Sequence, residues 1–106
     1  MISKTPEPPY YAVIFTNVRT EGDQGYAATS EKMIALAKKQ SGFLGVEHTR
    51  EGLGITVSYW KDLESIKKWK NHAEHKLARN RGRSDWYLSF KVRIARVERD
   101  YGFNMG

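Results

Sequence analysis

The segment from Asn71 to Tyr87 contains the side chains of this sequence that are best suited to proton transfer. It holds His72 and His75, three residues apart, and Arg79 opens a run of arginines that follows them. An imidazole changes its charge near pH ~6.5 and can exchange a proton with a bound molecule. A guanidinium stays protonated, so it can stabilise an oxyanion but cannot act as a base. These residue types are suited to acid–base chemistry, with a histidine as the proton carrier and an arginine as the cation.

The same segment also fits the water-facing side of an ordinary helix. On one uninterrupted helix, an apolar stripe turns toward the core and both histidines turn toward solvent. That stripe consists of Leu63, Ile66, Trp69, Ala73 and Leu77. A competing signal is Asn71 with Glu74 three residues later, the spacing of a capping pair that starts a new helix. A break at Asn71 would reset the helical phase and allow His75 to point into a pocket.

Metal binding and thiol chemistry find little support in the composition. The chain has three histidines and no cysteine, which excludes disulfides, thiolate nucleophiles and cysteine-ligated metals. His72 and His75 have the spacing of a ligand pair, but no carboxylate stands in an established ligand position beside them. We therefore predict no metal site. The lack of cysteine is also typical of a reducing cytoplasm, where we expect the protein to reside.

The formal charge of +6 is concentrated in the second half of the chain. Residues 1–60 carry six basic and six acidic side chains, whereas residues 61–106 carry twelve and six. Part of this excess is the run of three arginines that begins at Arg79. Arg79 and Arg81 of this run precede Gly82, which is suited to end a helix, and basic residues there complement the helix dipole. Nucleic-acid modules instead interleave such residues with exposed stacking aromatics, so nucleic-acid binding is disfavoured.

The hydrophobic pattern predicts six regular elements in the order β-α-β-β-α-β. They are a strand at 10–19, a helix within 28–42, two strands within 43–60, a helix from residue 61 and a long strand within 86–101. This order predicts a ferredoxin-like α+β domain, with a four-stranded antiparallel sheet and both helices on one face. We place the domain at residues 10–103, after a proline-rich extended lead-in at residues 1–9. No segment approaches the ~20 apolar residues of a membrane span, so no membrane partner is expected.

Single residues set several of the expected boundaries. Gly42 is suited to end the first helix, and Glu51–Gly54 supplies glycines for a tight hairpin. Asp62 is suited to cap the start of the second helix. In the last strand, apolar residues share one face up to Ile94, and the alternation then slips by one residue at Ala95–Arg96. Such a slip predicts a β-bulge. The residues of that face are Trp86, Leu88, Phe90, Val92 and Ile94.

The first strand is apolar on both of its faces. Tyr10, Ala12 and Ile14 point to one side of the sheet, and the equally apolar residues between them point to the other. A sheet with one wet face alternates apolar with polar residues. Two helices cover only one face, and a second copy related by two-fold symmetry can cover the other. We therefore expect a homodimer that buries ~800 Å² per partner.

Three stretches carry a more specific pattern. They are GFLGVEHTR (Gly42–Arg50), ITVSYWKDLESIKKWKNHAEH (Ile55–His75) and GRSDWY (Gly82–Tyr87). Together they resemble the antibiotic biosynthesis monooxygenase superfamily, and the likeness extends over about Tyr10–Tyr101. The resemblance implies a dimeric α+β barrel built from two ferredoxin-like sheets. The superfamily mixes cofactor-free quinone-forming oxygenases, haem-degrading enzymes and members of no known reaction, so the fold alone does not determine the chemistry.

The resemblance also implies roles for particular residues. A tryptophan at the position of Trp69 borders a pocket between helices and sheet, where a flat aromatic molecule or a porphyrin can stack. Asn17 matches a strand asparagine that hydrogen-bonds the ligand or oxygen in haem-degrading relatives. Those relatives carry an axial histidine ten residues after the tryptophan, and this chain has Arg79 there, which cannot ligate iron. His75 lies four residues earlier, so haem binding is weakened as an alternative.

The leading hypothesis is oxygenation of an aromatic small molecule without a cofactor. An electron-rich phenolate can give an electron directly to dioxygen, provided that the protein supplies an apolar slot, a base and a group that stabilises the anion. The candidates are Trp69 and Phe15 for the slot, His72 as a further binding residue, His75 for the base, and Arg79 or Asn17 for the anion. Two alternatives stay open: a haem-binding or haem-degrading protein, and a non-catalytic small-molecule-binding dimer.

Overall fold

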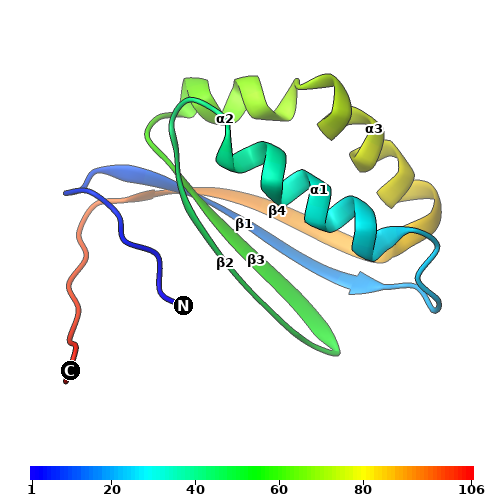
Figure 1. Ribbon diagram of the computed structural model, residues 1–106, viewed down its shortest axis with the longest axis horizontal. Coiled ribbons are helices and arrows are strands. Elements are labelled where there is room, and N and C mark those ends of the chain that lie inside the picture. The colour runs from blue at the N-terminus through cyan, green and yellow to red at the C-terminus, as the bar shows by residue number, and fades with distance from the viewer.

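The protein consists of one antiparallel sheet and one layer of helices (Figure 1). The computed structural model describes residues 1–106, except for the side chain of Ala73. The elements are β1 (Tyr10–Arg19), α1 (Tyr26–Lys38), β2 (Phe43–Glu51), β3 (Leu53–Trp60), α2 (Leu63–Lys70), α3 (Ala73–Arg81), a π-helical turn η1 (Gly82–Trp86) and β4 (Tyr87–Val97). The strand order is β2-β3-β1-β4, and every neighbouring pair is antiparallel. This arrangement confirms the predicted ferredoxin-like α+β fold.

The core lies between the helices and the middle of the sheet. Trp60, at the end of β3, is fully buried and packs with Ala37 of α1 and Ile66 of α2. The Phe43 ring meets the Trp60 ring edge-on at 5.4 Å. Around these residues, partly buried apolar side chains complete the cluster, among them Trp69. Among the described helices, none is both long enough and apolar enough to cross a membrane.

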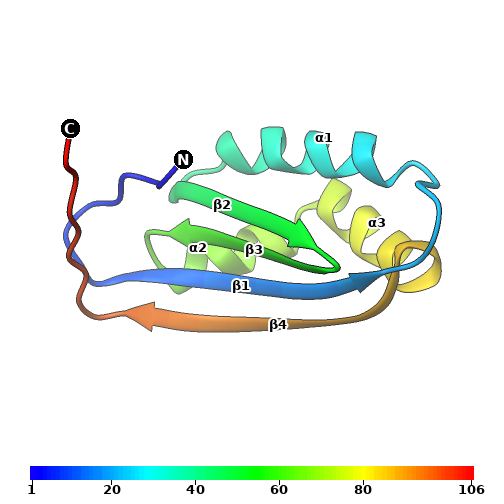
Figure 2. The same ribbon diagram turned by 90° about the horizontal axis from the view of Figure 1, so that it is seen from below.

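Strand pairing determines which side chains face the helices. β1 pairs with β3 so that Tyr11 lies beside Trp60 and Ala12 lies beside Tyr59. The odd-numbered residues of β1 therefore face the helices, and the even-numbered residues face the open side, which is nearest the viewer in Figure 2. Both sets are largely apolar, as the sequence indicated. We refer to the side of the sheet opposite the helices as the open face.

The first helix and the hairpin are shorter than predicted. α1 ends at Lys38 because its last turn tightens, with Lys39 and Gln40 donating to carbonyls three residues back at 3.1 and 3.0 Å. The prediction that the helix runs to Gly42 was wrong. In the hairpin, Gly52 alone separates β2 from β3, with a φ of 79° that favours glycine. Gly54, predicted as part of the link, is a buried residue of β3.

The bulge in the last strand lies elsewhere than predicted. Ala95 and Arg96 pair regularly with β1, and the register shifts between Val18 and Arg19, where the partner strand passes over Leu88. The helix-facing side of β4 stays half exposed at Val92 and Ile94, with exposed fractions of 48% and 53%. A strand that the helices do not fully cover needs no strict apolar pattern, so the slip in the sequence does not correspond to a bulge.

Trp86 was also placed wrongly by the sequence pattern. It ends η1 rather than starting β4, and its side chain is buried. The indole Nε1–H donates to the Gln24 carbonyl at 3.0 Å, which ties η1 to the start of α1. The α-helix α3 does end before Gly82, as predicted, and Gly82 is its C-cap, but this glycine is not left-handed. Its φ of −58° and ψ of −43° are helical, and the chain passes directly from α3 into the π-helical turn.

The second helix breaks where the sequence suggested. α2 starts at the predicted cap, where the Asp62 carboxylate accepts the Ser65 N–H at 2.8 Å, and it ends at Lys70. α3 begins at Ala73. The predicted capping pair is nevertheless wrong, because Asn71 ends α2 and the residue before α3 is His72, which makes no side-chain cap. The Glu74 carboxylate instead meets Lys32 of α1 at 3.1 Å.

Candidate functional site

Three of the predicted site residues form one aromatic group at the junction of α2 and α3. The Trp69 ring stacks on the His75 ring with centroids 4.6 Å apart and planes at 24°. The centroid of the Trp69 ring also lies 6.2 Å from that of buried Trp60 and 5.6 Å from that of His72. The break after α2 makes this grouping possible, since it resets the phase of α3 and turns His75 back over Trp69.

A hydrogen bond at this break determines which ring nitrogen of His75 carries the proton. The Trp69 carbonyl lies near the end of α2, and it accepts the His72 backbone N–H at 3.0 Å. His75 Nδ1 also lies 3.0 Å from this oxygen. A carbonyl oxygen only accepts hydrogen bonds, so this contact requires the hydrogen on Nδ1. Neutral His75 therefore carries its free lone pair on Nε2.

The surroundings keep His75 neutral. Burial lowers the pKa of His75 below its usual value of 6.5, and the charges of Arg79 and His72 lower it further. The hydrogen bond to the Trp69 carbonyl acts in the opposite direction without reversing the shift. At pH 7 the imidazole is thus unprotonated, and Nε2 is available as a base.

Two buried nitrogens of this group lack a partner within the described part of the chain. They are His72 Nδ1 and Arg79 Nε. Leaving a buried polar atom unpaired costs about 1–3 kcal/mol, so such atoms are enriched where a ligand or solvent completes the bonding. Arg79 Nε is a donor and requires an acceptor, such as the oxygen of a phenolate. Both residues were predicted members of the site.

The other two predicted residues lie in a second group on the helix-facing side of β1. Asn17 is only 2% exposed, and its side-chain oxygen accepts a hydrogen bond from Arg50 Nη2. Phe15 makes edge contacts with Tyr87 at 5.3 Å and with Phe90 at 5.7 Å. The predicted residues thus lie in two places: at the α2–α3 junction and near the end of β1.

Sequence reasoning missed the residues that surround Asn17. Arg50 shares the helix-facing side of β2 with Val46, because β2 alternates in register with β3. A charged residue in the inward phase of a strand was the signal that could have identified it. Tyr26, the first residue of α1, meets the Tyr87 ring edge-on at 5.8 Å. No short-range pattern indicated that contact, which joins two segments far apart in the sequence.

The pKa values of Tyr26 and Tyr87, the two tyrosines of this second group, are shifted in opposite directions. Burial and a hydrogen bond with Tyr26 raise the pKa of Tyr87 well above its usual value. Burial alone would raise the pKa of Tyr26 as well. Hydrogen bonds from Tyr87 and Arg50, together with the charge of Arg50, instead lower it below 10.0. Groups whose surroundings separate their pKa values in this way are common at functional sites.

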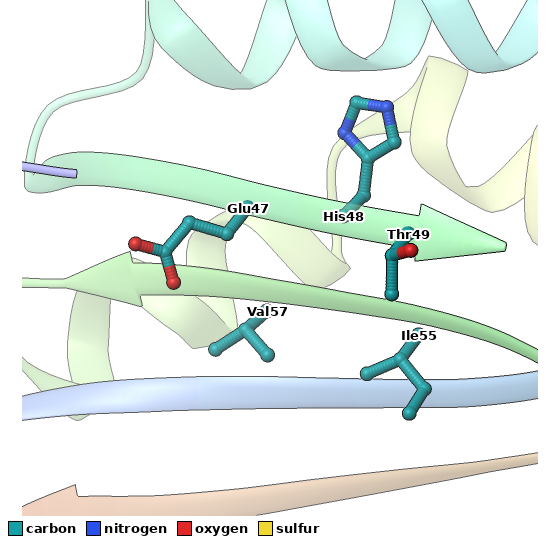
Figure 3. A pocket seen from close by; sticks show the side chains of 5 residues that line it. All are labelled: Glu47, His48, Thr49, Ile55 and Val57. Atoms are coloured by element: carbon teal, nitrogen blue, oxygen red, sulfur yellow. The ribbon is translucent and has the colours of Figure 1, made fainter. Parts of the chain in front are cut away.

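Two hollows lie on the open face rather than under the helices. One, of about 210 Å³, is lined by Glu47, His48, Thr49, Ile55 and Val57. Figure 3 shows Glu47, Ile55 and Val57 on the same side of the hairpin, with the His48 ring pointing the other way. The other, of about 240 Å³, lies over β1 and β4. Among the described residues, no three His, Asp or Glu side chains gather as metal ligands would.

The fold places this chain in the class of ferredoxin-like α+β domains, and the Trp69–His75 stack lies at the junction of α2 and α3. Within that class, residues 9–81 match the family model for antibiotic biosynthesis monooxygenases, and the chain belongs to this family. It is 57% identical over 100 residues to the uncharacterized protein YqjZ of Bacillus subtilis, covering 92% of this chain and 88% of YqjZ.

Solved structures share the fold at low identity. Rv0793 from Mycobacterium tuberculosis superposes with a TM-score of 0.75 at 11% identity, and the match covers 89% of this chain and 99% of the Rv0793 chain. A mutant of SnoaB from Streptomyces nogalater, a cofactor-independent oxygenase, superposes with a TM-score of 0.74 at 9% identity. The match covers 86% of this chain and 95% of SnoaB.

The residues present do not fit an axially ligated haem at the position expected from haem-degrading relatives. That position is Arg79, whose guanidinium lies close enough to His75 for its charge to lower the pKa of the imidazole. A guanidinium that stays protonated does not coordinate iron. The haem alternative therefore depends on His75 alone.

Proposed function

We propose that this protein is a cofactor-independent monooxygenase that oxidises a phenolic aromatic molecule between the helices and the sheet. The observation that carries the proposal is the state of His75. Its ring is stacked on Trp69, its Nδ1–H is bound to the Trp69 carbonyl, and its Nε2 is free as a base. Membership of the monooxygenase family and the fold shared with an oxygenase that needs no cofactor support the same chemistry.

Each candidate residue has a role in this reaction. His75 Nε2 takes the phenol proton, and the Arg79 guanidinium stabilises the phenolate. Trp69 provides a flat surface for the ring, and His72 borders it. Phe15 and Asn17 bind the far end of the molecule. A well-placed general base of this kind contributes about 10²–10⁴-fold to a rate.

The atoms and electrons balance without a further reductant. The phenolate gives one electron to dioxygen, and the resulting superoxide and phenoxyl radical combine to form a C–O bond. The hydroperoxide then loses water at a carbon that carried hydrogen, which leaves a quinone carbonyl. One oxygen atom enters the product and the other leaves as water, so the substrate itself supplies the electrons.

Oxygen uptake with a panel of hydroxynaphthalenes and anthrones tests this proposal. We expect uptake with formation of a quinone, and a fall of about 10²-fold or more in His75→Gln. His48→Gln is the matched control, because His48 pairs with Thr56, four residues along β3 from the Trp60 that packs with Trp69. If the whole panel gives no uptake, the protein is a binder rather than an oxygenase. A Soret shift with hemin that disappears in His75→Ala but persists in Arg79→Ala would instead assign haem binding.

We also propose that two copies pair through the open face. Val18, Leu53, Ile55 and Val57 lie there on adjacent strands, and Val18 and Leu53 are 37% and 48% exposed. Monomeric proteins rarely leave a large contiguous apolar patch in water. A second copy with the same face covers it under two-fold symmetry.

A further inference from the structure

Arg19 and Arg50 both lie close to the Tyr26 ring, on the helix-facing side of the sheet near the end of β1. The Arg19 guanidinium carbon lies 3.6 Å from the centre of the Tyr26 ring, and that of Arg50 lies 6.0 Å from it. Arg50 Nη2 donates to Asn17 and also lies 3.5 Å from the Tyr26 hydroxyl. Two guanidinium groups around one ring concentrate positive charge at one point of the molecule.

The position of Arg50 is fixed from two sides. Asn17 holds one nitrogen of its guanidinium, and Gly54 of β3 lies directly beneath it. A Cβ at Gly54 would overlap the guanidinium, so the missing side chain makes the room that Arg50 occupies. The side chain of Arg50 is otherwise exposed, which leaves the rest of the fork open to a ligand. A fork held in place in advance loses little freedom when it binds.

Neither arginine is neutralised by a carboxylate in the described residues, where the ion pairs are Lys32–Glu74 and Arg81–Asp85. Arg19 donates to the Trp86 carbonyl at 2.9 Å, which fixes it without cancelling its charge. The nearby Asp23 carboxylate is engaged by two backbone N–H groups, of Gly25 at 3.0 Å and Ala27 at 3.1 Å. The lowered pKa of Tyr26, to which the charge of Arg50 contributes, agrees with a positive potential here.

We propose that Arg50, supported by the charge of Arg19, binds a carboxylate of the aromatic substrate. The inference rests on the proposed function and narrows its substrate class to hydroxylated aromatic acids. The acid group of such a molecule lies at Arg50, beside Asn17. A guanidinium binds a carboxylate through two parallel hydrogen bonds, which gives orientation as well as affinity.

Two ligands that differ only in the carboxylate test this assignment. Isothermal titration calorimetry compares 6-hydroxy-2-naphthoate with 2-naphthol on the wild-type protein. We expect the acid to bind about tenfold more tightly or better, since a charge-assisted contact of this kind is worth that much. The advantage should shrink as salt is raised. Equal affinities, or no binding of either ligand, would overturn the proposal without any substitution being made.

Variants then locate the contact. Arg50→Gln should remove the preference, so that the variant binds the acid and 2-naphthol with equal affinity. Gly54→Ala keeps the charge but displaces the guanidinium, and it should reduce the preference as well. Arg99→Gln, which removes the same charge from an exposed site, is the matched control and should have no effect. A preference that survives both Arg50→Gln and Gly54→Ala contradicts the assignment.

The outcomes separate this inference from the proposed function. Acid binding that depends on Arg50, without oxygen uptake, supports the subsite and rejects the oxygenase. Oxygen uptake with 2-naphthol and with its acid at equal kcat/KM supports the oxygenase and rejects the subsite.

Discussion

At the scale of single residues, the sequence was enough to propose His75 as a base but not to assign its tautomer. The sequence indicated His75 because imidazole titrates near neutral pH. The tautomer depends on a carbonyl oxygen at Trp69, which carries no sequence information of its own. The pairing of Asn17 with Arg50 joins residues 33 positions apart, and only the register of three strands brings them together.

The pH dependence of kcat/KM follows from the state of His75. Its pKa is lowered from 6.5 by burial, so the imidazole loses its proton at a pH below 6.5. We expect kcat/KM to fall on acidification with an inflection below pH 6.5 and to be level above it, until the substrate phenol ionises near ~10. Initial rates of oxygen uptake between pH 5 and 8 measure this. An inflection above 6.5, or the same profile in His75→Gln, would contradict the role of His75 as base.

At the scale of elements, the order of strands and helices was predictable, while their ends depended on contacts between distant segments. The strand at residues 10–19 and the cap at Asp62 were predicted from local signals, and both were confirmed. The passage from α3 into η1 was not predictable, because Trp86 is held by a hydrogen bond to Gln24, 62 positions away. The slip at Ala95–Arg96 was misleading because the helices cover β4 only partly, so its apolar pattern does not report the register of the strand.

The cap at the start of α2 makes a prediction about stability. Asp62→Ala removes the acceptor of the Ser65 N–H and should lower the free energy of unfolding by about 0.5–2 kcal/mol. Urea denaturation followed by circular dichroism measures the change. Glu64→Ala, an acidic residue of the same first turn that does not accept this hydrogen bond, is the control and should cost less. Equal losses in the two variants would mean that charge near the helix start matters rather than the cap.

At the scale of the whole molecule, the sheet separates two surfaces for which we propose different roles. The helix-facing side holds Trp69, His75 and Arg50, and the open face holds the apolar patch around Ile55 and Val57. The excess of apolar residues on both faces was visible in the sequence. Which side each one faces became certain only with the register.

Pairing through the open face predicts a stable dimer that a single charge disrupts. Ile55→Lys places a charge in the centre of the proposed interface, and we expect sedimentation equilibrium to show monomers at micromolar concentration, where wild type is dimeric. An unpaired buried charge is strongly destabilising. Leu77→Lys on α3, where the side chain is already 70% exposed, should leave the dimer intact. A wild-type monomer at that concentration would reject the dimer.

The two-residue connection between α2 and α3 also sets the direction in which a whole helix faces. Successive helical residues are rotated by about 100° from one another. Adding or losing one residue at Asn71–His72 would therefore swing every ring and guanidinium of α3 around its axis, with the sheet left untouched. A chain with the same fold but a connection of another length would thus turn different side chains of this helix toward the sheet. A single insertion in such a connection can redirect the chemistry without any change to the residues that perform it.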